Sequence, residues 1–141
     1  MSTRVAADAE AIAIEILLAN SDVTATFGDR IGTELDLTKA EELPKLRLTT
    51  VSTRGVVRRH LDAASIQLEA WAGSRIAAKT ALEVARGALL EDNLEGTYPP
   101  HGVLTGTDNG VGPVPRPDPE TSTPRWLCTV VLYCHPAPAT P

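Results

Sequence analysis

The order of hydrophobic patterns along the chain predicts a two-layer α+β domain, with a mainly antiparallel sheet and two helices on one face. In residues 65–90, a strand with period-two alternation runs directly into an amphipathic helix. An apolar helical pattern precedes this segment, and short strands joined by turn-forming connections lie on both sides of it. The predicted order is α-β-β-β-α-β-β, which places the helices in one layer and the strands in the other.

Length and composition bound the classes of protein that fit. The 141 residues suffice for a single domain, 1–141, with its own core. Aromatic residues make up only 4%, so we expect a core of Val, Ile, Leu and Ala. A net charge of −5 disfavours a protein whose main task is to hold nucleic acid. Acidic residues interrupt the apolar N-terminal segment, unlike a secretory signal, and no run approaches the ~18 apolar residues of a membrane span. We therefore expect a cytosolic product.

The first predicted helix covers residues 5–19. Apolar residues recur there at helical spacing, and Ile14 and Leu18 widen the apolar stripe well beyond one face. A helix of this kind is usually covered on two sides. The second cover is either another part of the same chain or a neighbouring subunit, and the pattern leaves both open.

Three strands are predicted between the two helices. The first, at residues 30–35, is short and follows a segment that can form a further turn of helix. The second, at 45–52, begins after Pro44, and a proline is tolerated at the start of a strand. The third, at 64–72, alternates strictly between apolar and polar residues. Trp71 lies on its polar face, so we expect a neighbouring element or subunit to bury this side chain.

The connection between the second and third strands carries the one concentrated basic patch of the sequence. Residues 53–60 are expected to form a hairpin connection with Gly55 in the turn. Its arginines either keep the edge of the sheet soluble or dock on an acidic neighbour or a phosphate group. Docking would also explain why two apolar residues, both valines, stand on a turn where they would otherwise be exposed. The residues concerned are Arg54, Val56, Val57, Arg58 and Arg59.

The second predicted helix covers residues 75–90. Ser74 is a good N-cap residue, because its hydroxyl can accept a bond from a free N–H of the first turn. Small side chains on one face allow the helix to lie close to the sheet. Gly87 lowers helix stability, and close packing is the only explanation that the sequence offers for it. The expected buried stripe consists of Ala78, Ala81, Leu82, Ala85 and Leu89.

The last third of the chain is rich in proline, with all but one of the eleven prolines after residue 98. Short strands are predicted at 102–107 and 125–135. Between them, residues 108–124 are expected to form a long surface loop that folding does not require, because proline cannot donate to a strand ladder. Residues 137–141 are expected to form a frayed tail.

Residues that carry chemistry are sparse. Cys128 and Cys134 lie about 20 Å apart along one predicted strand, too far for a disulfide, so we expect two buried free thiols. The three histidines are isolated, and no zinc motif, phosphate-binding loop or nucleophile elbow is present. The acidic run at Glu91, Asp92 and Glu95 is typical of solvated surface, although paired carboxylates can also serve acid–base catalysis. We therefore expect no catalytic residue, no metal, no cofactor and no enzymatic activity.

Several segments recur in the order found in one family. They are Gly28–Ile31 (GDRI), the proline-led strand Pro44–Leu48, Ile66–Ala72 (IQLEAWA) and the alanine-rich helix at 77–90. In this layout the chain resembles the tail-terminator and tail-completion proteins, which join head and tail in long-tailed bacteriophages. The resemblance runs from the first helix to His135. The proline-rich segment 108–124 departs from it.

The resemblance implies a non-enzymatic virion protein that forms a ring, usually of six subunits, at the head-proximal end of the tail tube. The implied partners are other copies of the chain, the tail tube protein and the head connector or stopper. DNA would pass through the ring without specific binding, which suits an acidic chain. The protein would be made in the host cytoplasm. Candidate interface residues are Ile14, Leu18, Arg54, Val56, Val57, Arg58, Arg59 and Trp71.

Two alternatives stay open at this point. The chain could be another head–tail adaptor or stopper, which sequence patterns do not separate from a terminator. It could also be a small α+β ligand-binding module or enzyme. That class would need a concave pocket with convergent polar groups, and the sequence does not indicate such a set.

Overall fold

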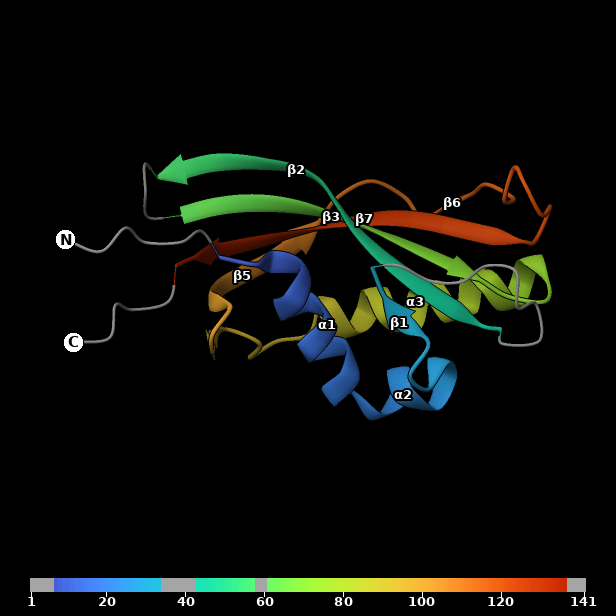
Figure 1. Cartoon of the computed structure of the whole chain (residues 1–141), viewed down its shortest axis with the longest axis horizontal. Coiled ribbons are helices and arrows are strands. Elements are labelled where there is room, and N and C mark those ends of the chain that lie inside the picture. The colour runs from blue at the N-terminus through green and yellow to red at the C-terminus, as the bar shows by residue number, and fades with distance from the viewer. Residues whose placement is uncertain (1–6, 34–42, 58–60, 137–141) are drawn as a thin grey trace.

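The computed structural model describes residues 7–33, 43–57 and 61–136. Within them it has three helices and a mixed sheet, so the α+β class is confirmed. Figure 1 shows the curled sheet as one layer, with the helices below it. The elements are α1 (Ala9–Ala19), α2 (Ser21–Phe27), β1 (Ile31–Gly32), β2 (Lys45–Val57), β3 (Leu61–Trp71), α3 (Arg75–Leu89), β4 (Gly96–Tyr98), β5 (Gly102–Asn109), β6 (Val114–Pro115) and β7 (Arg125–His135).

The sheet is built around three long antiparallel strands, β2, β3 and β7. Its strand order is β1-β2-β3-β7-β5-β4, and β6 also pairs with β7. In the centre, Leu48 lies opposite Leu68, which in turn lies opposite Cys128. Among the described strands, only β1 runs parallel to its neighbour, pairing Ile31 with Leu46. This one parallel pair makes the sheet mixed.

The core lies between the helices and one face of the sheet. Every second residue of β7 is buried, from Trp126 to Cys134, as the alternation predicts. The helix α3 buries the predicted alanine and leucine stripe, with Ala88 in addition. Both cysteines are buried and free, as expected. Burial raises the pKa of the Cys128 thiol to about 12 and that of the Cys134 thiol to about 11, so neither is a reactive thiolate near neutral pH.

Polar side chains cap the helices. The Ser74 hydroxyl accepts a hydrogen bond from the Ala77 N–H at 3.1 Å, as predicted. Asp8 caps α1 in the same way by accepting from the Ala11 N–H at 3.0 Å. Asn20 ends α1 and caps α2, because its side-chain oxygen accepts from the N–H groups of residues 22 and 23. The turn residues after the first helix therefore start a second one.

The predicted order of elements is wrong in three places. It lacks α2 as a full helix, and it lacks the short strands β4 and β6. It also ends the second strand too early, since β2 keeps its pairing with β3 as far as Val57. Two irregularities in register, at 50–52 and 55–57, let the ladder continue through the expected turn. The predicted tail at 137–141 lies outside the described residues.

The proline-rich segment, residues 108–124, lies at the surface as predicted, but the expectation that its prolines prevent pairing with the sheet is wrong. The strand β5 extends to Asn109, and the Gly110 N–H then donates to the Thr129 carbonyl at 3.0 Å. Further along, β6 pairs with β7, and the Arg116 N–H donates to the Arg125 carbonyl at 2.9 Å. The prolines at 113, 115 and 117 alternate with residues that keep their N–H groups, so the missing donors do not prevent pairing.

Candidate functional site

The predicted interface residues fall in three separate places. Trp71 is buried under the proline-rich segment. Ile14 and Leu18 belong to α1, while Arg54 and Val56 belong to the outer part of β2. Val57 is the last residue of β2. Arg58 and Arg59 lie outside the described residues.

Trp71 is only 1% exposed, so the expectation that a neighbouring element buries it is confirmed. Its indole N–H donates to the Asp118 Oδ2 at 3.0 Å. The guanidinium carbons of Arg47 and Arg125 lie 5.2 and 5.7 Å from the ring centroid, within cation–π range. The cover comes from the same chain, which makes Trp71 part of the folded domain and not of an exposed surface.

The carboxylate of Glu69 accepts hydrogen bonds from both of these arginines, Arg47 and Arg125. Glu69 is 2% exposed, and its carboxylate accepts two bonds from Arg47, at 3.0 and 2.9 Å. It also accepts one bond from Arg125 at 2.9 Å. We call Arg47, Glu69, Trp71, Asp118 and Arg125 the Trp71 cluster. Lys45, opposite Trp71 in the register, is buried beside it.

Asp118 closes the Trp71 cluster from the side of the proline-rich segment. Its Oδ1 accepts from the N–H groups of Glu120 and Thr121 at 2.9 and 3.2 Å. Burial alone raises the pKa of this carboxyl. The two backbone bonds, the indole bond and the nearby Arg125 charge outweigh burial and hold the pKa of Asp118 below its ordinary 3.8. Both oxygens are thus engaged, and the cluster fastens the segment to the sheet.

The outer part of β2 has the opposite character. Every residue from Thr49 to Val56 is exposed, and we call this stretch the free half of β2. Val51 is 50% exposed and Val56 is 45% exposed, on either side of Arg54. The short strand β1 pairs only with residues 46 and 47, so no described strand borders the outer edge of the free half. One backbone donor of this edge is already used, since the Thr50 N–H donates to the Glu10 carboxylate at 2.6 Å. The rest of such an edge is ready to pair with another chain.

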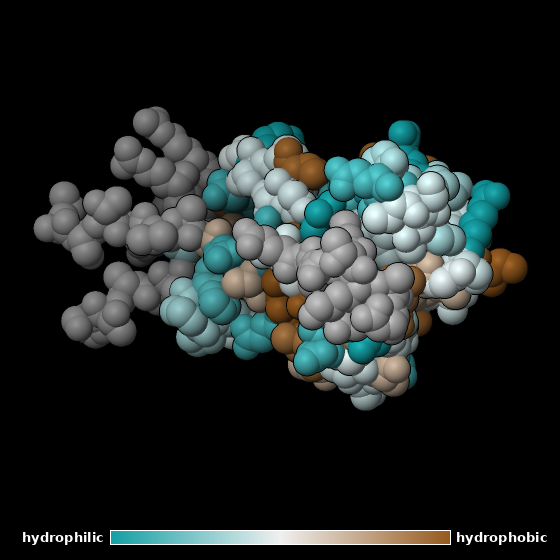
Figure 2. Space-filling model, turned by 45° about the vertical axis from the view of Figure 1, so that its right-hand side comes forward, coloured by the Kyte–Doolittle hydropathy of each residue, from teal (hydrophilic) through white to brown (hydrophobic). Residues whose placement is uncertain are grey.

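On α1, the two predicted residues differ. Leu18 is 46% exposed, whereas Ile14 is half-buried and packs against the core. The helix therefore uses most of its wide apolar stripe inside the chain. On the side seen in Figure 2, apolar side chains gather near the middle of the view, and isolated ones lie at its upper and right-hand edges.

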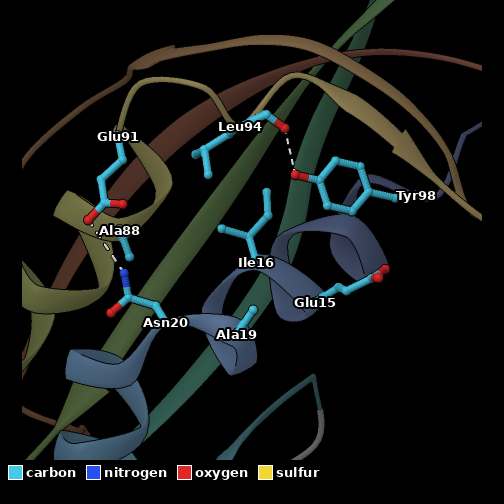
Figure 3. A pocket seen from close by; sticks show the side chains of 8 residues that line it. All are labelled: Glu15, Ile16, Ala19, Asn20, Ala88, Glu91, Leu94 and Tyr98. Carbon is cyan, nitrogen blue, oxygen red and sulfur yellow. Dashed lines mark hydrogen bonds between the residues drawn. The ribbon is translucent and has the colours of Figure 1, made fainter.

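A hollow lies where α1, the end of α3 and β4 meet (Figure 3). It has a volume of about 240 Å³. Asn20 bridges it by donating to the Glu91 carboxylate at 3.4 Å, and the Tyr98 hydroxyl donates to the Leu94 carbonyl at 2.5 Å. Burial, with the charges of Glu15 and Glu95, raises the pKa of the Tyr98 phenol. The lining residues are Glu15, Ile16, Ala19, Asn20, Ala88, Glu91, Leu94 and Tyr98.

A second hollow, of about 480 Å³, lies beside the first, between α2 and α3. The two hollows share Asn20, Ala88 and Glu91 in their linings, and we call the pair of them the helix groove. The second hollow adds Asp22, Ala25, Thr26, Glu83, Val84 and Gly87 to the lining.

The predicted acidic run contributes only Glu91 to the helix groove. Three more carboxylates, those of Glu15, Asp22 and Glu83, come from other parts of the sequence. The spacing of Glu83, Gly87 and Glu91, four residues apart along α3 and just past its end, could have indicated one wall. The opposite wall depends on how α1 and α2 pack on α3, which the sequence pattern does not show.

Within the described ranges, no group of three or more His, Cys, Asp or Glu side chains is placed to hold a metal ion. No described helix is long and apolar enough to cross a membrane.

Comparison with known proteins shows a similarity of fold to a solved structure, without a match in sequence. No protein-family model matches the chain, and no curated protein is significantly similar to it in sequence. Among solved structures, a chain of the "Virion of native gene transfer agent (GTA) particle" superposes with a TM-score of 0.71. The match covers 89% of this chain and 92% of that chain, at 13% sequence identity. The two chains therefore share a fold over nearly their whole length.

Proposed function

We propose that this chain is a structural component of a phage-like virion, which forms a ring at the head-proximal end of the tail tube. There it ends tube polymerisation and presents the surface that joins the head. The observation that carries the proposal is the fold shared with a chain of the gene transfer agent virion, across 92% of that chain. The order of segments that resembles the tail-terminator family supports the finer assignment.

The surface of the molecule supports a role in assembly. Exposed apolar side chains at Leu18, Val51 and Val56 sit on two different elements, where a neighbouring subunit could cover them. Arg54 provides an exposed charge between the two valines. Trp71 takes no part in this surface, because its own chain covers it. The interface that we propose consists of Leu18, Arg54, Val56, Val57, Arg58 and Arg59, with Ile14 supporting Leu18 from within.

In this proposal the protein acts by surface complementarity and turns over no substrate. Contacts between different patches on neighbouring subunits are head-to-tail, and such contacts close into rings when the rotation permits. The ring can require the tail tube as a template, so monomers in dilute solution are compatible with it. Partners are further copies of the chain, the tube protein and the head connector.

Deleting the gene and examining the particles by electron microscopy tests the proposal. A terminator predicts tails of uncontrolled length, together with heads that lack tails. Tails of normal length that fail to join heads would indicate an adaptor or stopper instead. Normal, infectious particles would refute a role in the virion. An antibody against the chain should label the head-proximal end of wild-type tails, and Arg58→Glu with Arg59→Glu should reduce this labelling.

A further inference from the structure

Gly87 is the first unexplained feature of the helix groove. It lies within α3 and is exposed, although glycine destabilises a helix interior relative to alanine. Close packing, the explanation available from sequence, is wrong for the described residues: apart from its neighbours and the backbone of its own helix, a Cβ built at this position meets none of their atoms within 4 Å. The bare backbone therefore leaves space that nothing in the described part of this chain uses, next to Glu83 and Glu91.

The lining of the helix groove suits a basic occupant with apolar flanks. It includes the carboxylates of Glu15, Asp22, Glu83 and Glu91, together with small or apolar side chains such as Ile16, Ala19 and Ala88. The nearby Arg86 contacts Glu83 at 3.6 Å, but it also donates to Asn109 at 2.6 Å on the side of the sheet. The remaining negative charge is open to a cation from outside.

The free half of β2 has the complementary features. Arg54 is exposed between Val51 and Val56, so one short extended segment carries a cation with an apolar side chain on each side. The free half pairs with β3 on one side and is the outermost described strand on the other, and the missing side chain at Gly87 suits a close approach of that outer side. Figure 1 places the free half of β2 at the upper left and α2 at the bottom, so one chain cannot fill its own groove.

We infer that the helix groove is the docking site for the free half of β2 of a second copy of this chain, with Arg54 of one copy placed among the groove carboxylates of the next. The inference rests on the proposed ring and specifies its contact. Because groove and strand are different surfaces, each copy donates to one neighbour and accepts from another. That head-to-tail pattern is the one that can close into a ring.

Cross-linking in assembled particles tests this contact. Particles are made with the double variant Arg54→Cys and Glu91→Cys, treated with a short bismaleimide and analysed on a denaturing gel. We expect a ladder of covalent oligomers up to the full ring. The wild type is the control and should give no ladder, because Cys128 and Cys134 are buried. Each single variant should also give none.

The outcomes separate the inference from the proposed function. If the double variant is present in particles but gives no ladder, the groove contact is wrong while the ring proposal stands. Dimers from Arg54→Cys alone would overturn it too, because they would show that like surfaces meet. If the wild-type chain is absent from particles, the proposed function fails, and the contact fails with it.

A second series tests the groove without changing charge. Gly87→Leu replaces a weak helix former by a strong one, so the isolated protein should melt at the same temperature or a few degrees higher. The side chain would fill the groove, and the number of copies per particle should fall at least tenfold. Thr80→Leu is the matched control, since it lies two turns earlier on the same exposed stripe and outside the groove lining. Equal incorporation of the two variants would contradict the inference.

Discussion

The two halves of strand β2 belong to one ladder yet have opposite surroundings. In the first half, Leu46 and Leu48 are completely buried in the core, and Arg47 on the other face is engaged by Glu69. In the free half, from Thr49 to Val56, every residue is exposed. Both halves pair with β3, so backbone pairing alone does not account for the difference.

What differs is the cover on the two faces. The helix α1 packs on β2 from the core side, and the Trp71 cluster fastens the proline-rich segment over the other face. The cover from α1 reaches the start of the free half, where the Glu10 carboxylate accepts a hydrogen bond from the Thr50 N–H at 2.6 Å, but the side chains from Thr49 to Val56 remain exposed. The buried half therefore contributes to the stability of the fold, whereas the free half keeps its side chains available for a partner. Substitutions in the two halves should accordingly separate effects on stability from effects on assembly.

The largest effect is expected at Trp71. Trp71→Ala should lower the free energy of unfolding by about 3–5 kcal/mol, because it removes a fully buried aromatic ring and leaves a cavity. Urea unfolding followed by circular dichroism measures this. Trp71→Phe is the matched control: it keeps most of the ring but loses the bond to Asp118, and should cost about 1–3 kcal/mol. An unchanged melting temperature for Trp71→Ala would show that the Trp71 cluster does not stabilise the buried half of β2.

Removing the charge that joins the two arginines should have the next largest effect. Glu69→Gln should cost about 2–3 kcal/mol in the same unfolding experiment. This is less than the ~3–5 kcal/mol typical of broken buried pairs, because the Arg47 side chain is 32% exposed and water screens its charge. Glu83→Gln is a suitable control, since Glu83 forms only a partly exposed pair on α3. Equal losses for the two variants would contradict the buried triad.

The Asp118 carboxylate should make the fastening of the proline-rich segment depend on pH. Its pKa is lower in the folded protein than the ordinary 3.8, so its ionised form stabilises the fold above that pH. This contribution is lost as the pH falls through the folded-state pKa. The urea midpoint of the wild type should therefore drop below pH 4 more steeply than that of Asp118→Asn. Parallel curves for the two proteins would rule out a linkage through Asp118.

Much of the fold follows from local pattern. The buried stripe of α3, the Ser74 cap and the alternation of β7 were all predictable, because each depends on residues a few positions apart. The burial of Trp71 was also predictable, since a large aromatic on a polar face needs a cover. The identity of that cover was not, because Asp118 is 47 residues away in the sequence.

The proline-rich segment and the helix groove show where pattern fails. Proline marks the absence of a donor, but the pairing of residues 110–118 depends on the N–H groups between the prolines, such as that of Arg116. The groove depends on the packing of three helices, which brings Glu15 and Asp22 to Glu91. Composition correctly indicated surface in both cases, but the pairing of the segment and the shape of the groove depend on tertiary contacts that composition does not show.

The smallest effect on stability should come from substitutions in the free half of β2. This prediction is the sharpest test of the difference between the two halves of the strand. Arg54→Ala should change the free energy of unfolding by less than about 0.5 kcal/mol, because its side chain is exposed and no buried partner depends on it. Arg47→Ala, seven residues earlier on the same strand, should cost more than about 1.5 kcal/mol, because it leaves the buried Glu69 with one partner fewer. In assembled particles the order should reverse, so that Arg54→Ala lowers the number of copies per particle more than Arg47→Ala does once both are folded. If Arg54→Ala instead destabilised the isolated protein as strongly as Arg47→Ala, the free half would belong to the fold, and the distinction between the two halves would be lost.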